Sequence, residues 1–365
     1  MRVVVDVTPL SRPRTGIGNY LRGLIGGLVD AGDLEIVAFG PVSPRGKGSV
    51  EEALAGLQIE RRLPVVPWAH AWRTAWSRLG RVPVERLTGP LDVFHFSDWM
   101  YPPQRSGLRA TTIYDLVPLR FPDWVTPRTR AMHTAKYRNA ARTCDLIVCI
   151  SRYTADDVAE RLGVTPERLS VAHPGLDRRF SPDGPARSEP APYILSVSTL
   201  GPRKNLAALV QAFSLLRTRR PDVSLLIAGP PSGVARAELQ VDGVKLLGFV
   251  PDEELAALYR GAAAFVYPSR LEGFGMPVIE ALASGTPVVA AAHPSLDEAC
   301  GDAALRVDPE NAEAFAETLE RALDERDALV APGLEHARGF TWEATGRAVV
   351  EAYQRALAGR GQEGS

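Results

Sequence analysis

Short apolar runs separated by helical patterns limit how this chain can fold more than any other feature of its sequence. The runs span residues 3–7, 34–39, 93–96, 110–114 and 145–150, and then residues 193–197, 224–228, 244–247, 263–267 and 288–290. A parallel strand that is buried on both faces is apolar along its length, and the connection to its parallel neighbour needs a crossover segment such as a helix. The alternation therefore predicts an α/β fold built from parallel βαβ units.

The helical patterns have recognisable ends. Ser151 precedes the pattern at residues 153–162 and is a favourable N-cap, and Gly285 follows the pattern at residues 277–283, where a C-terminal glycine is expected. Further helices are expected up to residue 29 and at residues 205–218, 252–260, 309–324 and 342–358.

The length of 365 residues indicates two domains. Residues 181–192 are rich in proline, lack periodicity and are expected to form a linker. We therefore predict an N-terminal Rossmann-like domain at residues 1–180 and a C-terminal Rossmann-like domain at residues 193–340. Residues 341–365 are expected to form a terminal helix that packs back on the N-terminal domain. Ligands of such open sheets bind at the carboxyl ends of the strands.

The composition is that of a water-soluble globular protein, with 45% hydrophobic and 23% charged residues. No apolar run reaches the roughly 20 residues that a membrane span needs, and the first apolar run is broken at Asp6, unlike a signal peptide. The three cysteines are odd in number and have no metal-binding spacing, which suggests reduced thiols. We expect a cytoplasmic protein, with peripheral contact at the inner face of the membrane as an open alternative.

Two carboxylates, Glu272 and Glu280, flank a glycine-rich turn that leads into a helical pattern beginning at Pro277. The first amides of a helix have no partner within it and can bind an anion, and Gly273 and Gly275 let a ligand approach the backbone closely. Glu272 is expected at the mouth of that anion site. Glu280 is expected about one turn into the helix, where a carboxylate can accept hydrogen bonds from a diol such as a ribose. The alternative is that both are ordinary acids at helix ends.

A second motif, Arg203 and Lys204, follows the first apolar run of the second domain and precedes a helix that Asn205 is expected to cap. A guanidinium and an ammonium beside a helix N-terminus suit a pyrophosphate. The alternative is a solvated basic pair in a loop.

Residues 272–280 resemble the E-x7-E motif of the retaining GT-B glycosyltransferases of family 4, which include group 1 mannosyl- and glucosyltransferases. Residues 202–205 match a Pro-Arg-Lys-Asn subgroup. The resemblance covers nearly the whole chain, and it implies two Rossmann-like domains facing a central cleft. It also implies that residues 1–180 form the acceptor-binding domain and residues 193–340 the nucleotide-sugar-binding domain. The catalytic residues that it implies are Glu272, Lys204 and Arg203. The donor-binding residues that it implies are Gly16, Gly18, Thr199, Arg203, Lys204, Val250, Gly273, Phe274, Gly275, Met276 and Glu280.

The chain departs from the family at two of these places. Many members have an arginine where this chain has Thr199, and Arg203 is expected to take over its role. The turn containing Gly16 and Gly18 resembles the family loop that closes over the donor, but Leu21 occupies the third glycine position of a dinucleotide-binding fingerprint. The alternative for this turn is a tight strand-to-helix connection. The turn at Val250 is expected to meet the nucleobase through backbone groups.

Tyr114 and Asp115 are the candidate acceptor residues, because they end an apolar run of the first domain where many relatives have a histidine near the transferred sugar. A tyrosine with a pKa near ~10 cannot act as a base near neutral pH. Asp115 either binds a sugar or acceptor hydroxyl or caps the following turn, and the sequence leaves both open.

Trp68, Trp72 and Trp76 recur every four residues among several arginines. An aromatic helix face with basic flanks is typical of a helix on a membrane surface, but it also fits a helix that packs on the domain core or lines an acceptor site. The net charge is +7 up to Phe180 and −8 after it. That asymmetry indicates either a basic surface for an anionic partner or compositional drift.

No histidine has metal-binding spacing, and the predicted cleft segments contain no Asp-x-Asp, so we expect neither a metal nor another cofactor. His95 and His173 are expected to be structural. The sequence thus predicts a retaining, metal-independent glycosyltransferase that moves a hexose, with mannose favoured, from a nucleotide-sugar to a hydroxyl of a saccharide, lipid-linked or natural-product acceptor. No nucleic-acid partner is expected.

Two alternatives share this architecture. One is a sugar-nucleotide epimerase, against which the basic loop at Arg203 and Lys204 argues. The other is a non-catalytic subunit that binds a nucleotide-sugar, against which the intact Glu272, Lys204 and Glu280 argue. An NAD oxidoreductase is disfavoured, because neither half has G-x-G-x-x-G followed by an acid about 20 residues later.

Overall fold

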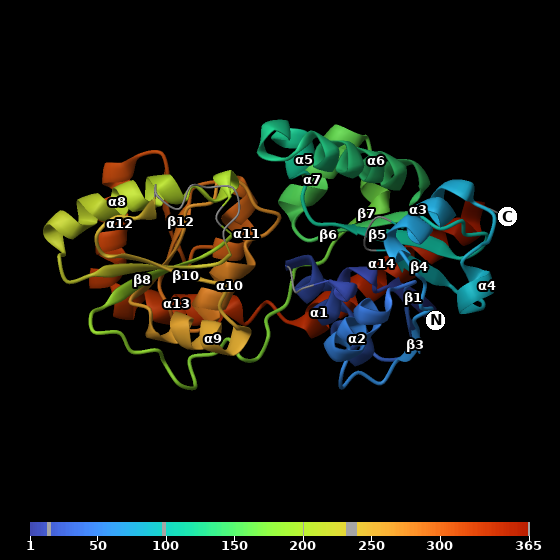
Figure 1. Ribbon diagram of the computed structural model, residues 1–365, viewed down its shortest axis with the longest axis horizontal. Coiled ribbons are helices and arrows are strands. Elements are labelled where there is room, and N and C mark those ends of the chain that lie inside the picture. Colours follow the sequence, from blue (N-terminus) through green and yellow to red (C-terminus); the bar gives the residue numbers. More distant parts are fainter. Residues whose placement is uncertain (13–15, 97–99, 200, 231–238, 364–365) are drawn as a thin grey trace. The chain divides into compact units, whose positions relative to one another are not determined.

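The computed structural model describes residues 1–12, 16–96, 100–199, 201–230 and 239–363 (Figure 1). The chain forms two compact units, of which unit 1 is Met1–Gly175 with Thr341–Ser365 and unit 2 is Leu176–Phe340. Residues 13–15 and Leu200, which belong to two of the predicted loops, lie outside the described residues.

Unit 1 contains a seven-stranded sheet whose described strand pairs are all parallel. The strands lie in the order β3-β2-β1-β4-β5-β6-β7, so the order reverses between β1 and β4. Their bounds are β1 Arg2–Asp6, β2 Glu35–Phe39, β3 Glu60–Arg62, β4 Val93–Phe96, β5 Leu108–Ile113, β6 Leu146–Cys149 and β7 Leu169–Val171.

Unit 2 contains a six-stranded parallel sheet in the order β10-β9-β8-β11-β12-β13, which reverses between β8 and β11. Its strands are β8 Tyr193–Val197, β9 Ser224–Ala228, β10 Val244–Gly248, β11 Ala264–Tyr267, β12 Val288–Ala291 and β13 Leu305–Val307. Two parallel, Rossmann-like sheets in one chain confirm the predicted fold class.

Helices connect the strands of both units. Those of unit 1 are η1 Thr8–Ser11, α1 Gly16–Asp30, α2 Pro44–Ala53, α3 Ala69–Leu79, α4 Glu85–Thr88, α5 Val117–Arg120, η2 Pro122–Trp124, α6 Pro127–Thr143, α7 Arg152–Leu162, η3 Pro166–Arg168 and α14 Trp342–Glu363. Those of unit 2 are η4 Pro202–Lys204, α8 Leu206–Arg219, α9 Asp252–Gly261, α10 Met276–Ala283, η6 Pro294–Leu296, α11 Asp297–Cys300, α12 Ala312–Asp324 and α13 Arg326–Ala337. Ser151 caps α7 as predicted, by accepting from the amide of Thr154.

The proline-rich segment at residues 181–192 lies against unit 2. Arg260 of α9 donates to the carbonyl oxygens of Arg179 and Pro185, and the amide of Arg187 donates to Ala257 of the same helix. The chain crosses between the units at Gly175–Leu176 and again at Phe340–Thr341, so the segment expected as a linker is part of the second compact unit.

The C-terminal helix α14 packs on α1 within unit 1. Glycines at the crossing let the two backbones approach, because a Cβ added to Gly27 would overlap the carbonyl oxygen of Trp342 and one added to Gly346 would overlap that of Gly27. The buried His95 of β4 is 2.6 Å from the hydroxyl of Tyr353 in α14 through Nδ1 and 2.8 Å from Thr112 through Nε2. Burial lowers the pKa of His95 to about 4, which agrees with a structural role.

The tryptophan stripe does not form one helix face. Trp76 is buried, packs on Phe39 and donates through Nε1 to the carbonyl of Val82. Trp68 lies just before α3 in a left-handed conformation with φ of 49°, and it is 87% exposed. Trp72 is 37% exposed and lies against Trp76. The stripe is therefore core at one end and surface at the other. No helix among the described residues is long and apolar enough to cross a bilayer.

The crossing of α1 and α14 yields a prediction with an internal control. Gly27→Ala should lower the free energy of unfolding by about 1–3 kcal/mol, because the added methyl group meets a backbone atom and the helices must separate. Gly26→Ala, one position earlier, meets no atom within 4 Å and should stabilise α1 by up to about 1 kcal/mol through helix propensity. Denaturant unfolding of both variants checks this, and equal effects would contradict the described packing.

Candidate active site

The carboxyl ends of β8 and β11 bring two predicted motifs together in unit 2. Arg203 and Lys204 lie in η4, which follows β8, and Glu272 follows β11. The order of the strands reverses between β8 and β11, and open α/β sheets bind ligands at such a switch point.

The carboxylate of Glu272 accepts a hydrogen bond from each of the two cations. Lys204 Nζ lies 2.6 Å from Oε1, and Arg203 Nη1 lies 2.9 Å from Oε2. Glu272 is only 7% exposed and Lys204 only 8% exposed. Lys204 Nζ also donates to the hydroxyl of Tyr267, at 2.8 Å. We call Arg203, Lys204 and Glu272 the Glu272 cluster, and its formal charge is +1.

The cluster keeps Glu272 ionised. Burial alone would raise the pKa of this carboxyl group, but the charges of Lys204 and Arg203 lower it to about 2. Because the folded pKa lies below the unfolded value, the carboxylate stabilises the fold above about pH 4.5 and loses that contribution as the pH falls through about 2.

Further polar side chains fix the position of Glu272. Ser269 Oγ donates to Oε1 of Glu272. The backbone amide of Glu272 donates to Ser295 Oγ, at 3.0 Å. Ser295 in turn lies 2.9 Å from Nδ1 of His293. Sequence reasoning did not identify Tyr267, Ser269 or Ser295. The only signal in the sequence for these three residues was their position at or soon after the carboxyl ends of β11 and β12.

The turn after Glu272 leads into α10 as the sequence predicts. Gly275 has φ of 110°, a conformation that residues with a side chain rarely adopt, and Met276 is the first residue of the helix. The ring of Phe274 is buried and packs edge-on against Phe340, so only the backbone of this residue is available to a ligand.

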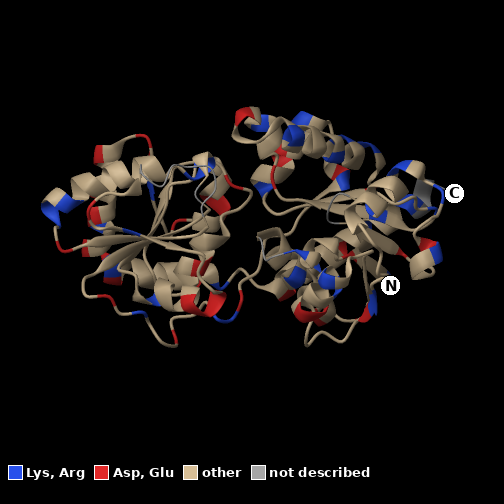
Figure 2. Ribbon diagram, viewed as in Figure 1, with Lys and Arg blue, Asp and Glu red and all other residues tan. Residues whose placement is uncertain are grey.

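Glu280 lies on α10 and differs electrostatically from Glu272. Burial raises its pKa to about 7, and the nearby carboxylates of Asp252 and Asp177 also raise it, whereas a 2.9 Å hydrogen bond from Tyr259 opposes the shift. The acidic first turn of α9, which contains Asp252, is red in Figure 2. Glu280 therefore exchanges its proton near neutral pH, while Glu272 does not.

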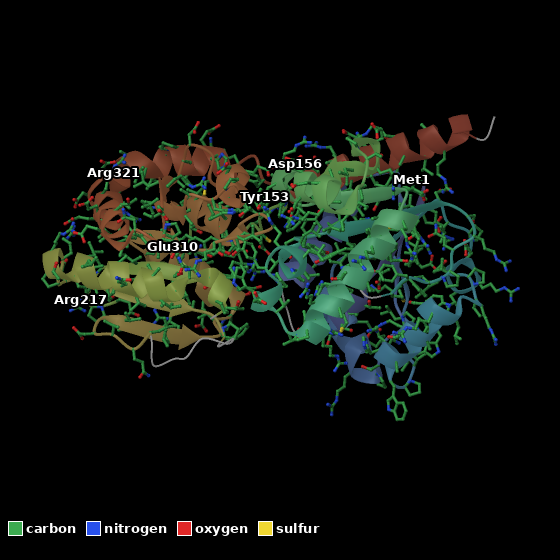
Figure 3. All side chains as sticks on the ribbon, turned by 90° about the horizontal axis from the view of Figure 1, so that it is seen from above. Met1, Tyr153, Asp156, Arg217, Glu310 and Arg321 are labelled. Carbon is green, nitrogen blue, oxygen red and sulfur yellow. The ribbon has the colours of Figure 1, made fainter. Side chains whose placement is uncertain are left out.

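Three other predicted residues of unit 2 have less specific surroundings. Thr199 is exposed beyond the end of β8, and Val250 is half-buried beyond the end of β10. Asn205 occupies the N-cap position of α8 but is left-handed, with φ of 52°, and its side chain does not cap the helix. It donates instead to Glu310, labelled in Figure 3, so the expected cap was wrong.

The predicted residues of unit 1 gather at the carboxyl ends of its strands. Gly16 and Gly18 lie in the first turn of α1, which follows β1. Tyr114, directly after β5, packs edge-on against Tyr20 with 5.4 Å between the ring centroids. Asp115 Oδ1 accepts from the amide of Val117 at the start of α5, so the capping role left open by the sequence is present.

The described residues contain no group of three or more histidine, cysteine, aspartate or glutamate side chains arranged to hold a metal ion. The cysteines of the chain, Cys144, Cys149 and Cys300, are buried and free.

Two family models match almost the whole chain. Residues 14–180 match glycosyltransferase family 4, and residues 177–333 match the glycosyl transferases group 1. A D-inositol 3-phosphate glycosyltransferase of Frankia alni is 33% identical over 79% of this chain and 80% of its own length. The O-antigen chain mannosyltransferase B of Escherichia coli is 28% identical over 97% of this chain and all of its own length.

Among solved structures, a sucrose-phosphate synthase of Thermosynechococcus elongatus superposes with a TM-score of 0.69 at 18% identity, covering 98% of this chain and 99% of that one. This similarity shows a shared fold. Together with the sequence matches, it shows that the chain belongs to the group 1 glycosyltransferases of family 4, with the GT-B fold.

Proposed function

We propose that this glycosyltransferase retains the anomeric configuration and transfers a hexose, with mannose favoured, from a nucleoside diphosphate sugar to a hydroxyl group without a metal ion. The Glu272 cluster is the observation that carries the proposal, because it fixes two cations at the switch point of unit 2. The mannosyltransferase similar to the chain over its full length supports the choice of sugar.

Arg203 and Lys204 are assigned to the diphosphate. When the bond between the sugar and the diphosphate breaks, negative charge develops on the departing phosphate oxygen. Cations that are already fixed in place stabilise this charge without reorganising during the reaction. Glu272 keeps Lys204 and Arg203 at hydrogen-bonding distance, and the N-terminus of α10 adds the partial positive charge of the helix dipole.

Glu272 is assigned to a hydroxyl group of the sugar. Each carboxylate oxygen can accept about two hydrogen bonds. Oε1 already accepts from Lys204 and Ser269, whereas Oε2 accepts from Arg203. Oε2 is therefore the oxygen that we assign to the donor sugar.

Glu280 is assigned to the ribose. Its carboxyl group lies on the first helix after the glycine turn and already accepts from Tyr259, which holds it in one orientation. The backbone near Val250 is assigned to the nucleobase.

The reaction that we propose follows a front-face route. The bond from the anomeric carbon to the diphosphate breaks, and its electron pair leaves with the phosphate oxygen. The acceptor oxygen then bonds to the same face of the anomeric carbon, and its proton passes to the departing phosphate. This route needs no protein nucleophile.

The acceptor is assigned to unit 1, at the carboxyl end of β5 near Tyr114 and Asp115. We propose a saccharide or lipid-linked acceptor. The O-antigen and inositol-phosphate transferases in the comparisons support a polar, hydroxyl-rich acceptor.

Lys204→Met tests the assignment of the diphosphate. It should lower the turnover of GDP-mannose or UDP-glucose by about 100- to 1,000-fold, the usual effect of removing one donor that stabilises developing charge. Lys245→Met removes a half-exposed lysine from the same unit and should leave turnover unchanged. Wild-type turnover, measured as release of nucleoside diphosphate, should persist in EDTA. Dependence on added magnesium or manganese, or an active Lys204→Met enzyme, would refute the proposal, as would a product of inverted configuration by NMR.

The pKa of Glu280 predicts a pH dependence of nucleotide binding. The ionised carboxylate accepts from both ribose hydroxyls, and with a pKa of about 7 it is mostly protonated at pH 6 and mostly ionised at pH 8. UDP or GDP affinity should rise by up to about tenfold from pH 6 to pH 8. The rise should be smaller in Glu280→Gln, because with this variant only the phosphate of the nucleotide changes its protonation in this pH range. Calorimetry that gives identical pH profiles for both proteins would rule out the ribose assignment.

A further inference from the structure

A groove of about 820 Å³ lies within unit 1 between α3 and α6, and the segment before β5 also lines it. Both helices are labelled in Figure 1, and the lysine and arginine positions of α6 are blue on the ribbon in Figure 2. The groove contains none of the residues assigned to the donor or the acceptor.

The charge lining the groove is of one sign. Its basic side chains are those of His70, Arg78, Arg109, Arg128, Lys136 and Arg142, and no aspartate or glutamate among the described residues lines it. Arg78, Arg128 and Arg142 form no ion pair with any described residue. By comparison, Arg219 and Arg220 of unit 2 each meet carboxylates. The groove is thus lined by positive charge, and three of its arginines have no carboxylate partner among the described residues.

Buried hydrogen-bond donors also line the groove. Asn139 Nδ2 and Arg109 Nε are inaccessible to solvent and have no hydrogen-bond partner among the described residues. A buried donor without a partner costs free energy, so such groups usually have one when the protein works. An anionic ligand with several oxygen atoms would supply acceptors to these two groups once their side chains turn toward the groove.

The remaining lining limits the ligand further. The groove also has apolar lining between its cations. This lining consists of Ala131, Met132 and Ala135 of α6 together with Pro102 and Pro103. Its volume exceeds that of a bare phosphate ion. Arginine forks match phosphate oxygens, and apolar walls match the organic part of a phosphate ester.

We propose that the α3–α6 groove binds a phosphate ester or diphosphate through its cationic side chains, separately from the donor site on unit 2. A lipid headgroup and a free phosphate compound share this chemistry. Trp68 and Leu79 are exposed apolar side chains at the two ends of α3. Because exposed apolar side chains favour a lipid surface, a lipid headgroup is tested as one of the two sources.

The test uses the full chain with Arg203→Gln, so that pyrophosphate binding at the donor diphosphate site is weakened while the buried Lys204–Glu272 pair stays intact. In this background, calorimetry with inorganic pyrophosphate should detect binding. Arg128→Gln with Arg142→Gln, both exposed positions where folding should not suffer, should weaken it by at least about tenfold. Arg130→Gln with Arg138→Gln changes the net charge equally on the same helix, but neither residue lines the groove, and this pair should change binding by less than about twofold.

A second arm distinguishes the two sources. Sedimentation with phosphatidylcholine vesicles containing phosphatidylglycerol, if lost in the groove pair and kept in the control pair, identifies a lipid headgroup. Groove-dependent pyrophosphate binding without vesicle binding identifies a free phosphate compound. The proposal fails if neither probe binds, or if the groove pair and the control pair behave alike, since the effect would then come from net charge alone.

Discussion

The ammonium group of Lys204 and the carboxylate of Glu272 lie 2.6 Å apart and are almost completely buried. Removing either charge would destabilise the fold, because removing one member of a buried ion pair commonly costs about 3–5 kcal/mol. The pair joins the loop after β8 to the loop after β11, at the place where the strand order of unit 2 reverses. The position of the cations, the glycine turn before α10 and the proposed chemistry all depend on this contact.

Two glutamates eight residues apart reach opposite electrostatic states because of what surrounds them. Both are removed from water, which by itself raises a carboxyl pKa. Two cations overcome that effect at Glu272, whereas Glu280 has other carboxylates nearby and one tyrosine hydroxyl as a donor. The first is a permanent anion that positions cations. The second has its pKa raised to about 7, so the ribose contact that we propose for it would be strongest above neutral pH, where the carboxylate is ionised.

The sequence predicts those strands and turns whose pattern lies in a few neighbouring residues. Central strands such as β1 and β11 are continuous apolar runs, and the glycine turn before α10 is visible in residues 273–275. The edge strand β3 is Glu-Arg-Arg, which has no apolar signal, and it was not predicted. The bond between Lys204 and Glu272 joins residues 68 positions apart, and the buried end of the tryptophan stripe depends on packing against Phe39. Such contacts follow from the topology of the sheets and have no pattern in the sequence.

Hydrogen–deuterium exchange of the full chain, with and without saturating UDP or GDP, tests most directly whether the Glu272 cluster is the donor site. The account predicts that nucleotide slows exchange at the amides in residues 203–206 and 272–280, because the bound nucleotide contacts both segments and restricts their local opening. Unchanged exchange in both segments, with protection confined to other parts of unit 2 or to unit 1, would contradict it.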